Sequence, residues 1–250
     1  MSKIYEALGA LETLEKGEQI HHETKLPEAL PPSSPWKRRL DIARRKEAEK
    51  RMVGFYQRVE ALLPDVNKKV IQFIGSHRGE GTSIIVRQFA AISAFKMQKS
   101  VLVLDTDATN PTQHDLFNVH WGHSLDDVIT EGGPIERAYC QVADPKLFVC
   151  LVSGNSIPPS QVLNGNGLLE MFRTRFDLVL IDSPPLEISS DGLAMVRQAD
   201  GVVLVIEAEK TRSPVVENLR DSIIEYGGHI LGVVFNKRRY HVPGWIYKRL

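Results

Sequence analysis

The sequence predicts one α/β domain, built on a mostly parallel central sheet with helices on both faces. Three observations support this prediction: short apolar runs the length of buried strands, helical stretches between them, and enough apolar residues for a large core. The expected strands lie at 70–75, 101–105, 147–154, 177–182, 201–208 and 230–236. The expected helices lie at about 83–97, 160–174, 190–199 and 212–227. Each of these helices is long enough for the crossover that joins two parallel strands.

The composition fits one large domain with extensions. The chain has 250 residues, of which 42% are hydrophobic and 25% charged, so a sizeable core is expected. Lysine plus arginine equals aspartate plus glutamate at 31 each, which argues against a protein whose main task is to neutralise a nucleic acid backbone. Cys140 and Cys150 have no metal-binding spacing, and we interpret them as small buried thiols in a reducing compartment.

The first 66 residues are expected to form an N-terminal helical extension in three segments. Residues 1–17 place apolar side chains at helical spacing, which predicts a short amphipathic helix. Residues 18–35 are rich in proline and polar side chains, as in a linker. Residues 36–66 are expected to form a basic helical segment that Pro64 terminates, and residues 67–250 the α/β domain.

The sequence favours a cytoplasmic location. It contains no run of about 18 apolar residues, and its first residues lack the apolar core of a signal peptide. The basic stretch after the linker and the basic tail around Trp245 could bind an anionic membrane surface. A solvated helix face and a tail folded back on the domain are the commoner explanations for such segments.

A glycine-rich turn follows the first expected strand and leads into a helix. Successive backbone N–H groups of such a turn can close around a phosphate, and the helix N-terminus adds a positive field. Ser83 stands where a hydroxyl group binds Mg²⁺ in phosphate loops. The residues expected to contact a nucleotide here are His77, Arg78, Gly79, Glu80, Gly81, Thr82 and Ser83.

This phosphate loop lacks its usual lysine. Thr82 stands where a lysine would reach the β- and γ-phosphates, and the loss of that cation weakens both phosphate binding and transition-state stabilisation. Arg78 lies a few positions earlier and could reach toward the phosphates in part. The sequence therefore predicts where a nucleotide would bind, and it leaves turnover open.

Carboxylates follow two of the expected strands. Asp105 and Asp107 come at the end of the second strand, and Asp182 ends the strand at 177–182. The carboxyl ends of parallel strands face the ligand crevice of such sheets. Each residue could simply be a polar side chain that closes a strand, but their agreement with the glycine-rich loop favours a functional site.

These motifs resemble those of the bacterial tyrosine kinase family. The segments that carry the resemblance are GEGTS, VLVLDTDATNP, FDLVLIDSPP and ILGVVFNKRRY, and the resemblance extends over about residues 45–240. That family is a MinD/ParA-like branch of the P-loop ATPases, and it regulates capsule or exopolysaccharide export through a membrane-embedded chain-length partner. The first and last residues of the chain also resemble members found in exopolysaccharide gene clusters.

The resemblance implies roles for individual residues. Ser83 would ligate Mg²⁺, while Asp105 and Asp182 would hold that ion directly or through water. Asp107 would be the catalytic base or a second metal contact, and Asn236 would read adenine. The implied cofactors are ATP or ADP with Mg²⁺. The implied partner is the cytoplasmic part of a membrane polysaccharide chain-length or export protein, which would recruit the chain to the inner face of the membrane.

The chain departs from the family pattern at several positions beyond Thr82. His77 stands where this branch often has a second lysine, and Thr109 where the family has an arginine. The glutamate–arginine–arginine oligomerisation pattern is missing ahead of the first strand. The tyrosine-rich tail is also missing, and Tyr240 and Tyr247 are the tyrosines near the end. Self-association and autophosphorylation therefore stay open.

Three functions are compatible with these features. The leading hypothesis is a regulatory nucleotide-binding subunit, or pseudo-kinase, of an exopolysaccharide biosynthesis and export system. The alternative is an active protein-tyrosine autokinase or ATPase of the same system, in which Arg78 or a basic residue of a neighbouring subunit replaces the missing cation. A ParA-like positioning ATPase ranks last, because both loop lysines are absent and the segment 183–185 reads Ser-Pro-Pro. No nucleic acid partner is expected.

Overall fold

The structure is a computed structural model that describes six stretches of the chain, with side chains from residue 46 onward. The stretches are 35–64, 67–119, 122–142, 146–154, 157–165 and 167–238. The predicted helix at 1–17, nearly all of the predicted linker, and the tail with Tyr240 and Tyr247 lie outside the described residues. Among the described residues, none of the helices combines the length and the apolar character that a membrane span needs.

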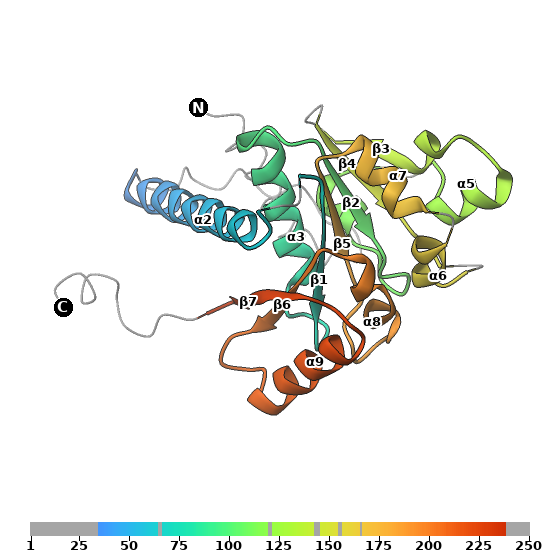
Figure 1. Cartoon of the computed structure of the whole chain (residues 1–250). Coiled ribbons are helices and arrows are strands. Elements are labelled where there is room, and N and C mark those ends of the chain that lie inside the picture. Colours follow the sequence, from blue (N-terminus) through green and yellow to red (C-terminus); the bar gives the residue numbers. More distant parts are fainter. Residues whose placement is uncertain are drawn as a thin grey trace, which may run out of the picture.

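The described residues form a seven-stranded, mostly parallel sheet (Figure 1). The strands are β1 (Lys69–Gly75), β2 (Val101–Asp105), β3 (Tyr139–Gln141), β4 (Leu147–Leu151), β5 (Leu178–Asp182), β6 (Gly201–Glu207) and β7 (Ile230–Asn236). Their order across the sheet is β3-β4-β2-β5-β1-β6-β7, and every neighbouring pair is parallel except β3 and β4. The predicted fold class is confirmed.

Helices connect the strands and cover both faces of the sheet. They are α2 (Pro35–Leu62), α3 (Thr82–Ala91), α4 (Gln113–Phe117), α5 (Leu125–Glu131), α6 (Pro159–Asn164), α7 (Leu168–Arg175), α8 (Asp191–Met195) and α9 (Ser213–Glu225). A π-helical turn extends α3 through Ile92–Lys96, and 3₁₀ turns lie at Ile135–Ala138 and Val196–Gln198. In Figure 1, α2 and α3 lie on one side of the sheet, whereas α7, α8 and α9 lie on the other.

All six predicted strands occur, and the structure adds β3. This strand has three residues and pairs antiparallel at the edge of the sheet, so it has no buried apolar run to reveal it. The single helix predicted at 160–174 is divided into α6 and α7, because Gly167 adopts a left-handed conformation with φ 64° between them. Cys150 is buried as expected, while Cys140 on β3 is half-buried.

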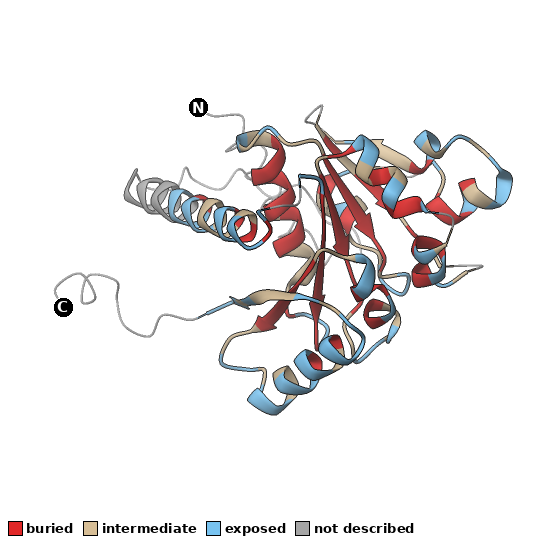
Figure 2. Ribbon diagram, in the orientation of Figure 1, coloured by how far each residue is buried: buried red, intermediate tan, exposed pale blue. Residues whose placement is uncertain are grey.

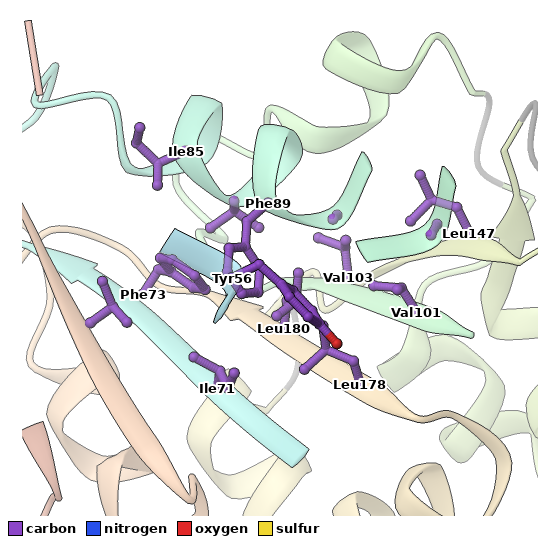
Figure 3. Packing of buried hydrophobic residues seen from close by; sticks show 14 of the residues in the cluster. Tyr56, Ile71, Phe73, Ile85, Phe89, Val101, Val103, Leu147, Leu178 and Leu180 are labelled. Atoms are coloured by element: carbon purple, nitrogen blue, oxygen red, sulfur yellow. The ribbon is translucent and has the colours of Figure 1, made fainter. Parts of the chain in front are cut away.

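One face of the sheet is closed by α2 and α3 around a group of aromatic rings (Figure 3). Phe89 of α3 is fully buried against Phe73 of β1, with ring centroids 5.6 Å apart. Phe55 and Tyr56 of α2 approach Phe89 at 5.1 and 5.8 Å. These contacts place the second half of the predicted basic helix against the core, where Tyr56 and Val59 are buried.

The opposite face is covered by the remaining helices except α4. Side chains of α5, α6 and α7 pack on β2 and β5, while α8 and α9 pack on β1 and β6. Successive residues of the central strands therefore enter one hydrophobic cluster or the other, and both sets are buried (Figure 2). This arrangement explains why the strands appear in the sequence as continuous apolar runs rather than alternating ones.

We expect Phe89→Ala to lower the free energy of unfolding by about 3–5 kcal/mol, because it leaves a cavity among Phe55, Tyr56 and Phe73. Urea unfolding would measure the loss. Ile224→Ser on α9 is a suitable control, since Ile224 is 58% exposed and its replacement should change stability by no more than about 0.5 kcal/mol. Equal losses in the two variants would contradict the packing described.

Candidate functional site

The loop between β1 and α3 has the backbone geometry of a phosphate-binding turn. Gly79 and Gly81 have φ values of 85° and 90°, in the left-handed region where a side chain is strained. Gly81 also precedes the first residue of α3, so the free N–H groups at the start of that helix face the turn. A Cβ atom at Gly81 would clash with the side-chain amide of Asn236, which donates to the Glu80 carbonyl at 2.8 Å. Glycine is therefore required at this position.

The carboxylate of Glu80 braces the loop from within. It is buried and accepts hydrogen bonds from the backbone N–H groups of Ser76 and His77, at 2.6 and 2.9 Å. Its second oxygen accepts the hydroxyl of Thr211, which lies between β6 and α9, at 2.5 Å. The side chain of Glu80 therefore holds the shape of the loop, together with the contact of its backbone carbonyl to Asn236.

A cavity of about 330 Å³ lies over this loop. All seven predicted loop residues from His77 to Ser83 line it, and so does Asp107 after β2. Asp105, Asp182 and Asn236 do not line the cavity. Asp105 and Asp182 are buried at strand ends, and Asn236 holds the loop at its edge.

Two buried carboxylates lie side by side at the ends of β2 and β5. The register of these parallel strands pairs Asp105 directly with Asp182. Asp105 accepts backbone N–H groups from Thr112 and Gln113 at 2.9 and 2.8 Å, and from Asp107 at 3.3 Å. Burial raises the pKa of Asp105 well above its ordinary value, the negative charge of Asp182 raises it further, and these three hydrogen bonds oppose the rise.

Asp182 is held differently from Asp105. Its Oδ2 atom accepts the side-chain amide of Gln113 at 2.8 Å, whereas its buried Oδ1 atom has no hydrogen-bond partner among the residues that the structure describes. Burial raises the pKa of Asp182 to about 6, while Gln113 and the hydroxyl of Ser83 lower it and the charge of Asp107 raises it. Ser83 and Asp182 thus act on one another across the base of the loop.

The chemistry of Ser83 and Asp182 fits Mg²⁺. A buried carboxylate oxygen without a donor is costly unless an ion or a water molecule satisfies it. Magnesium binds oxygen ligands and keeps several of its waters, so it needs only one or two protein groups together with phosphate oxygens. The oxygens of Asp105 already accept three backbone N–H groups, which suits support of the site better than direct coordination.

Sequence comparisons find bacterial tyrosine-protein kinases among the relatives, although no family model matches the chain. The chain is 26% identical over 185 residues to the tyrosine-protein kinase YwqD of Bacillus subtilis strain 168, covering 72% of this chain and 77% of the relative. It is 25% identical over 175 residues to the tyrosine-protein kinase CpsD of Streptococcus agalactiae, covering 68% and 75%. The chain is a homologue of the bacterial tyrosine kinases.

Solved structures agree on the fold of this tyrosine kinase homologue. The kinase domain of the Escherichia coli tyrosine kinase ETK superposes with a TM-score of 0.70 at 20% identity, over 93% of this chain and 90% of that one. The septum site-determining protein MinD with Mg-ADP, from Pyrococcus horikoshii OT3, gives 0.55 at 17% identity, over 73% and 76%. The fold is that of the MinD/ParA-like P-loop NTPases.

Three basic side chains lie around the loop in the described part of this kinase homologue, and each already has a hydrogen-bond partner. His77 Nδ1 lies 2.7 Å from Glu187, which also accepts the backbone N–H of Arg78 at 2.5 Å. These contacts, first the Arg78 N–H and then His77, hold the pKa of Glu187 below its usual range. The Arg78 guanidinium donates to Thr109 at 3.0 Å, and Thr109 in turn donates to Asp107. The third basic side chain is Lys237, whose ammonium donates to the carbonyl of Gly79.

Lys237 and Gln113 belong to the site, although sequence reasoning missed both. Lys237 lines the cavity, and its ammonium donates to the carbonyl of Gly79 at 2.5 Å. Its position directly after Asn236 was the available signal. Gln113 connects the two buried aspartates, and nothing in its local sequence marks it, because its partners lie 30 and 69 residues away.

We expect Asp182→Asn to stabilise the ligand-free protein at pH 8. Because the pKa of Asp182 is raised to about 6 in the folded state, ionisation costs stability as the pH rises from about 4 to about 6, and the cost is complete above that range. The gain should be roughly 2–3 kcal/mol at pH 8 and near zero below pH 4. Urea unfolding in EDTA would measure it, and a gain independent of pH would contradict the assignment.

Proposed function

We propose that the chain is a regulatory nucleotide-binding subunit, of pseudo-kinase character, in an exopolysaccharide biosynthesis and export system. One observation carries the proposal. The glycine-rich loop and the Ser83–Asp182 pair are present, but Thr82 stands where a phosphate loop has its lysine. The tyrosine kinases among the relatives of this chain support the kinase-like part of the proposal. Binding and signalling need the first two features, whereas phosphoryl transfer also needs the cation.

The arrangement of charges supports binding without rapid turnover. Residue 82 lines the cavity but is a threonine, so it brings no ammonium to the phosphate positions. His77 is engaged with Glu187, and Arg78 is engaged with Thr109 at the other side of the cavity. A nucleotide would be held by backbone N–H groups and by Mg²⁺, which supplies charge to the phosphates when it is bound.

An active tyrosine autokinase or ATPase is the second candidate. The observation that favours it is Lys237, whose ammonium lies on the loop itself and lines the same cavity as Arg78. The side chain of Lys237 is 46% exposed and shares its counter-ion Glu207 with Lys210, so its ammonium could exchange its present acceptors for an arriving phosphate. Asp107, which also lines the cavity, would then be the base.

We further propose ATP or ADP with Mg²⁺ as the ligands and a membrane polysaccharide chain-length or export protein as the partner. Such a partner would recruit the chain to the inner face of the membrane. Asn236, which lies beside Gly81 and donates to the Glu80 carbonyl, is the proposed adenine contact. We also propose that the chain can associate with itself, as a homo-oligomer.

Calorimetric titration of the purified chain with ATP and ADP, with Mg²⁺ present, tests the proposed function directly. We expect both nucleotides to bind, and we expect Asp182→Ala to lose most of the binding because the Mg²⁺ contact is removed. Ile224→Ser is the control for a remote surface change. No binding at millimolar nucleotide would contradict both candidates and leave a scaffold that acts through its surfaces.

Thr82→Lys should restore the missing cation. An ammonium next to the phosphate positions should tighten ATP binding about tenfold or more, roughly 1.4 kcal/mol, because charge-assisted contacts to phosphate are strong. Ile224→Lys adds the same charge on an exposed site of α9 and should leave ATP affinity unchanged.

ATP hydrolysis by the same variants separates the two candidates. Hydrolysis that appears only with Thr82→Lys supports the pseudo-kinase, because the rest of the machinery would then be intact. Hydrolysis by the wild-type chain, lost on Lys237→Gln, supports the active enzyme instead. An unchanged ATP affinity in Thr82→Lys would show that residue 82 does not face the phosphates.

A further inference from the structure

Gln113 connects three parts of the candidate site that are far apart in the sequence. It is the first residue of α4 and is completely buried. Its backbone N–H donates to Asp105 Oδ2 at 2.8 Å. Its side-chain amide donates to Asp182 Oδ2 at 2.8 Å and to the carbonyl oxygen of Ser83 at 3.0 Å. One residue therefore joins the ends of β2 and β5 to the first turn of α3.

The amide of Gln113 determines which oxygen of Asp182 is available. A carboxylate has two oxygens, and the Gln113 amide takes Oδ2, which leaves Oδ1 without a donor among the described residues. The Oε1 atom of Gln113 is also buried and without a partner in the described part of the chain. Buried acceptors of this kind are costly unless an ion or an ordered water satisfies them.

We propose that Gln113 is a positioning residue of the magnesium–nucleotide site. It holds the Asp182 carboxylate in the orientation that presents Oδ1 to the ion or to one of its waters, and it holds Ser83 at the same time. Groups that support metal ligands in this way change metal affinity strongly when they are removed. The inference rests on the proposed nucleotide-binding function and adds to it a residue that does not itself line the cavity.

Gln72 on β1 provides a matched control. It too is completely buried, its side-chain amide also donates two hydrogen bonds, and its Oε1 atom is likewise without a partner among described residues. Its acceptors are the Ser183 hydroxyl at 2.8 Å and the Gly192 carbonyl at 2.6 Å, neither of which is a carboxylate. Ser183 also lines the cavity, so Gln72→Met removes a buried amide that contacts the cavity wall, whereas of the two glutamines only Gln113 donates to Asp182.

Gln113→Met and Gln72→Met keep the side-chain length and remove the amide. ADP affinity of each full-length chain would be measured by calorimetry with Mg²⁺ and with EDTA. We expect Mg²⁺ to increase the ADP affinity of wild type and of Gln72→Met by the same factor. For Gln113→Met that factor should be smaller by about tenfold or more. The ADP affinity in EDTA should be equal in all three chains.

Binding of Mn²⁺ in the presence of ADP, followed by electron paramagnetic resonance, gives a readout that does not depend on activity. Mn²⁺ should bind about tenfold or more weakly to Gln113→Met than to Gln72→Met. Thermal unfolding would compare the folding of the two variants. If Gln113→Met does not fold, Gln113→Asn keeps the amide but shortens its reach, and it should lose the same Mg²⁺-dependent gain.

The outcomes separate this inference from the function on which it rests. A wild-type chain that binds no ADP would overturn both. A wild-type chain that binds ADP with a gain from Mg²⁺, together with an equal gain in Gln113→Met, would overturn the role of Gln113 alone. Equal losses of ADP affinity with and without Mg²⁺, shared by Gln113→Met and Gln72→Met, would mean that both glutamines act only on the fold.

Discussion

The pairing of two buried carboxylates is the constraint on which the site depends. The register between β2 and β5 places Asp105 beside Asp182, where burial opposes ionisation of both and the charge of Asp182 further opposes ionisation of Asp105. The fold offsets this cost with N–H donors, all of which come from the segment that follows β2 or from the start of α4. The position of α4, and with it the loop that carries Asp107, is therefore tied to the charge at the end of the sheet.

The phosphate loop has a frame of its own. Glu80 closes the loop from inside, Asn236 holds its outer edge, and the segment after β5 adds backbone hydrogen bonds from Leu186 and Glu187 to Gly75 and Ser76. These contacts, all within the protein, stabilise the shape of the loop. The loop can therefore bind a nucleotide through its backbone. The rate of phosphoryl transfer depends in addition on a cation placed beside the transferred phosphate.

Sequence reasoning recovered what local patterns encode. The six long strands are apolar runs, and the loop is marked by Gly79 and Gly81. The short strand β3 was not predicted, because three residues at the edge of the sheet carry no buried apolar run. The inward direction of Glu80 and the bridge made by Gln113 also escaped, because both depend on partners brought close by the sheet; the hydroxyl that Glu80 accepts lies 131 residues away. Roles that the resemblance implied for Asp107 and Asn236 stay predictions.

The aromatic contacts of α2 have a mechanical consequence. Phe55 and Tyr56 both touch Phe89, and Phe89 lies on the helix whose first residue is Thr82. A displacement of α2 would therefore act, through these edge-on and tilted ring contacts, on the helix whose N-terminus borders the phosphate loop. Since 34 residues precede α2, a partner that bound them would be connected to the loop through α2 and Phe89.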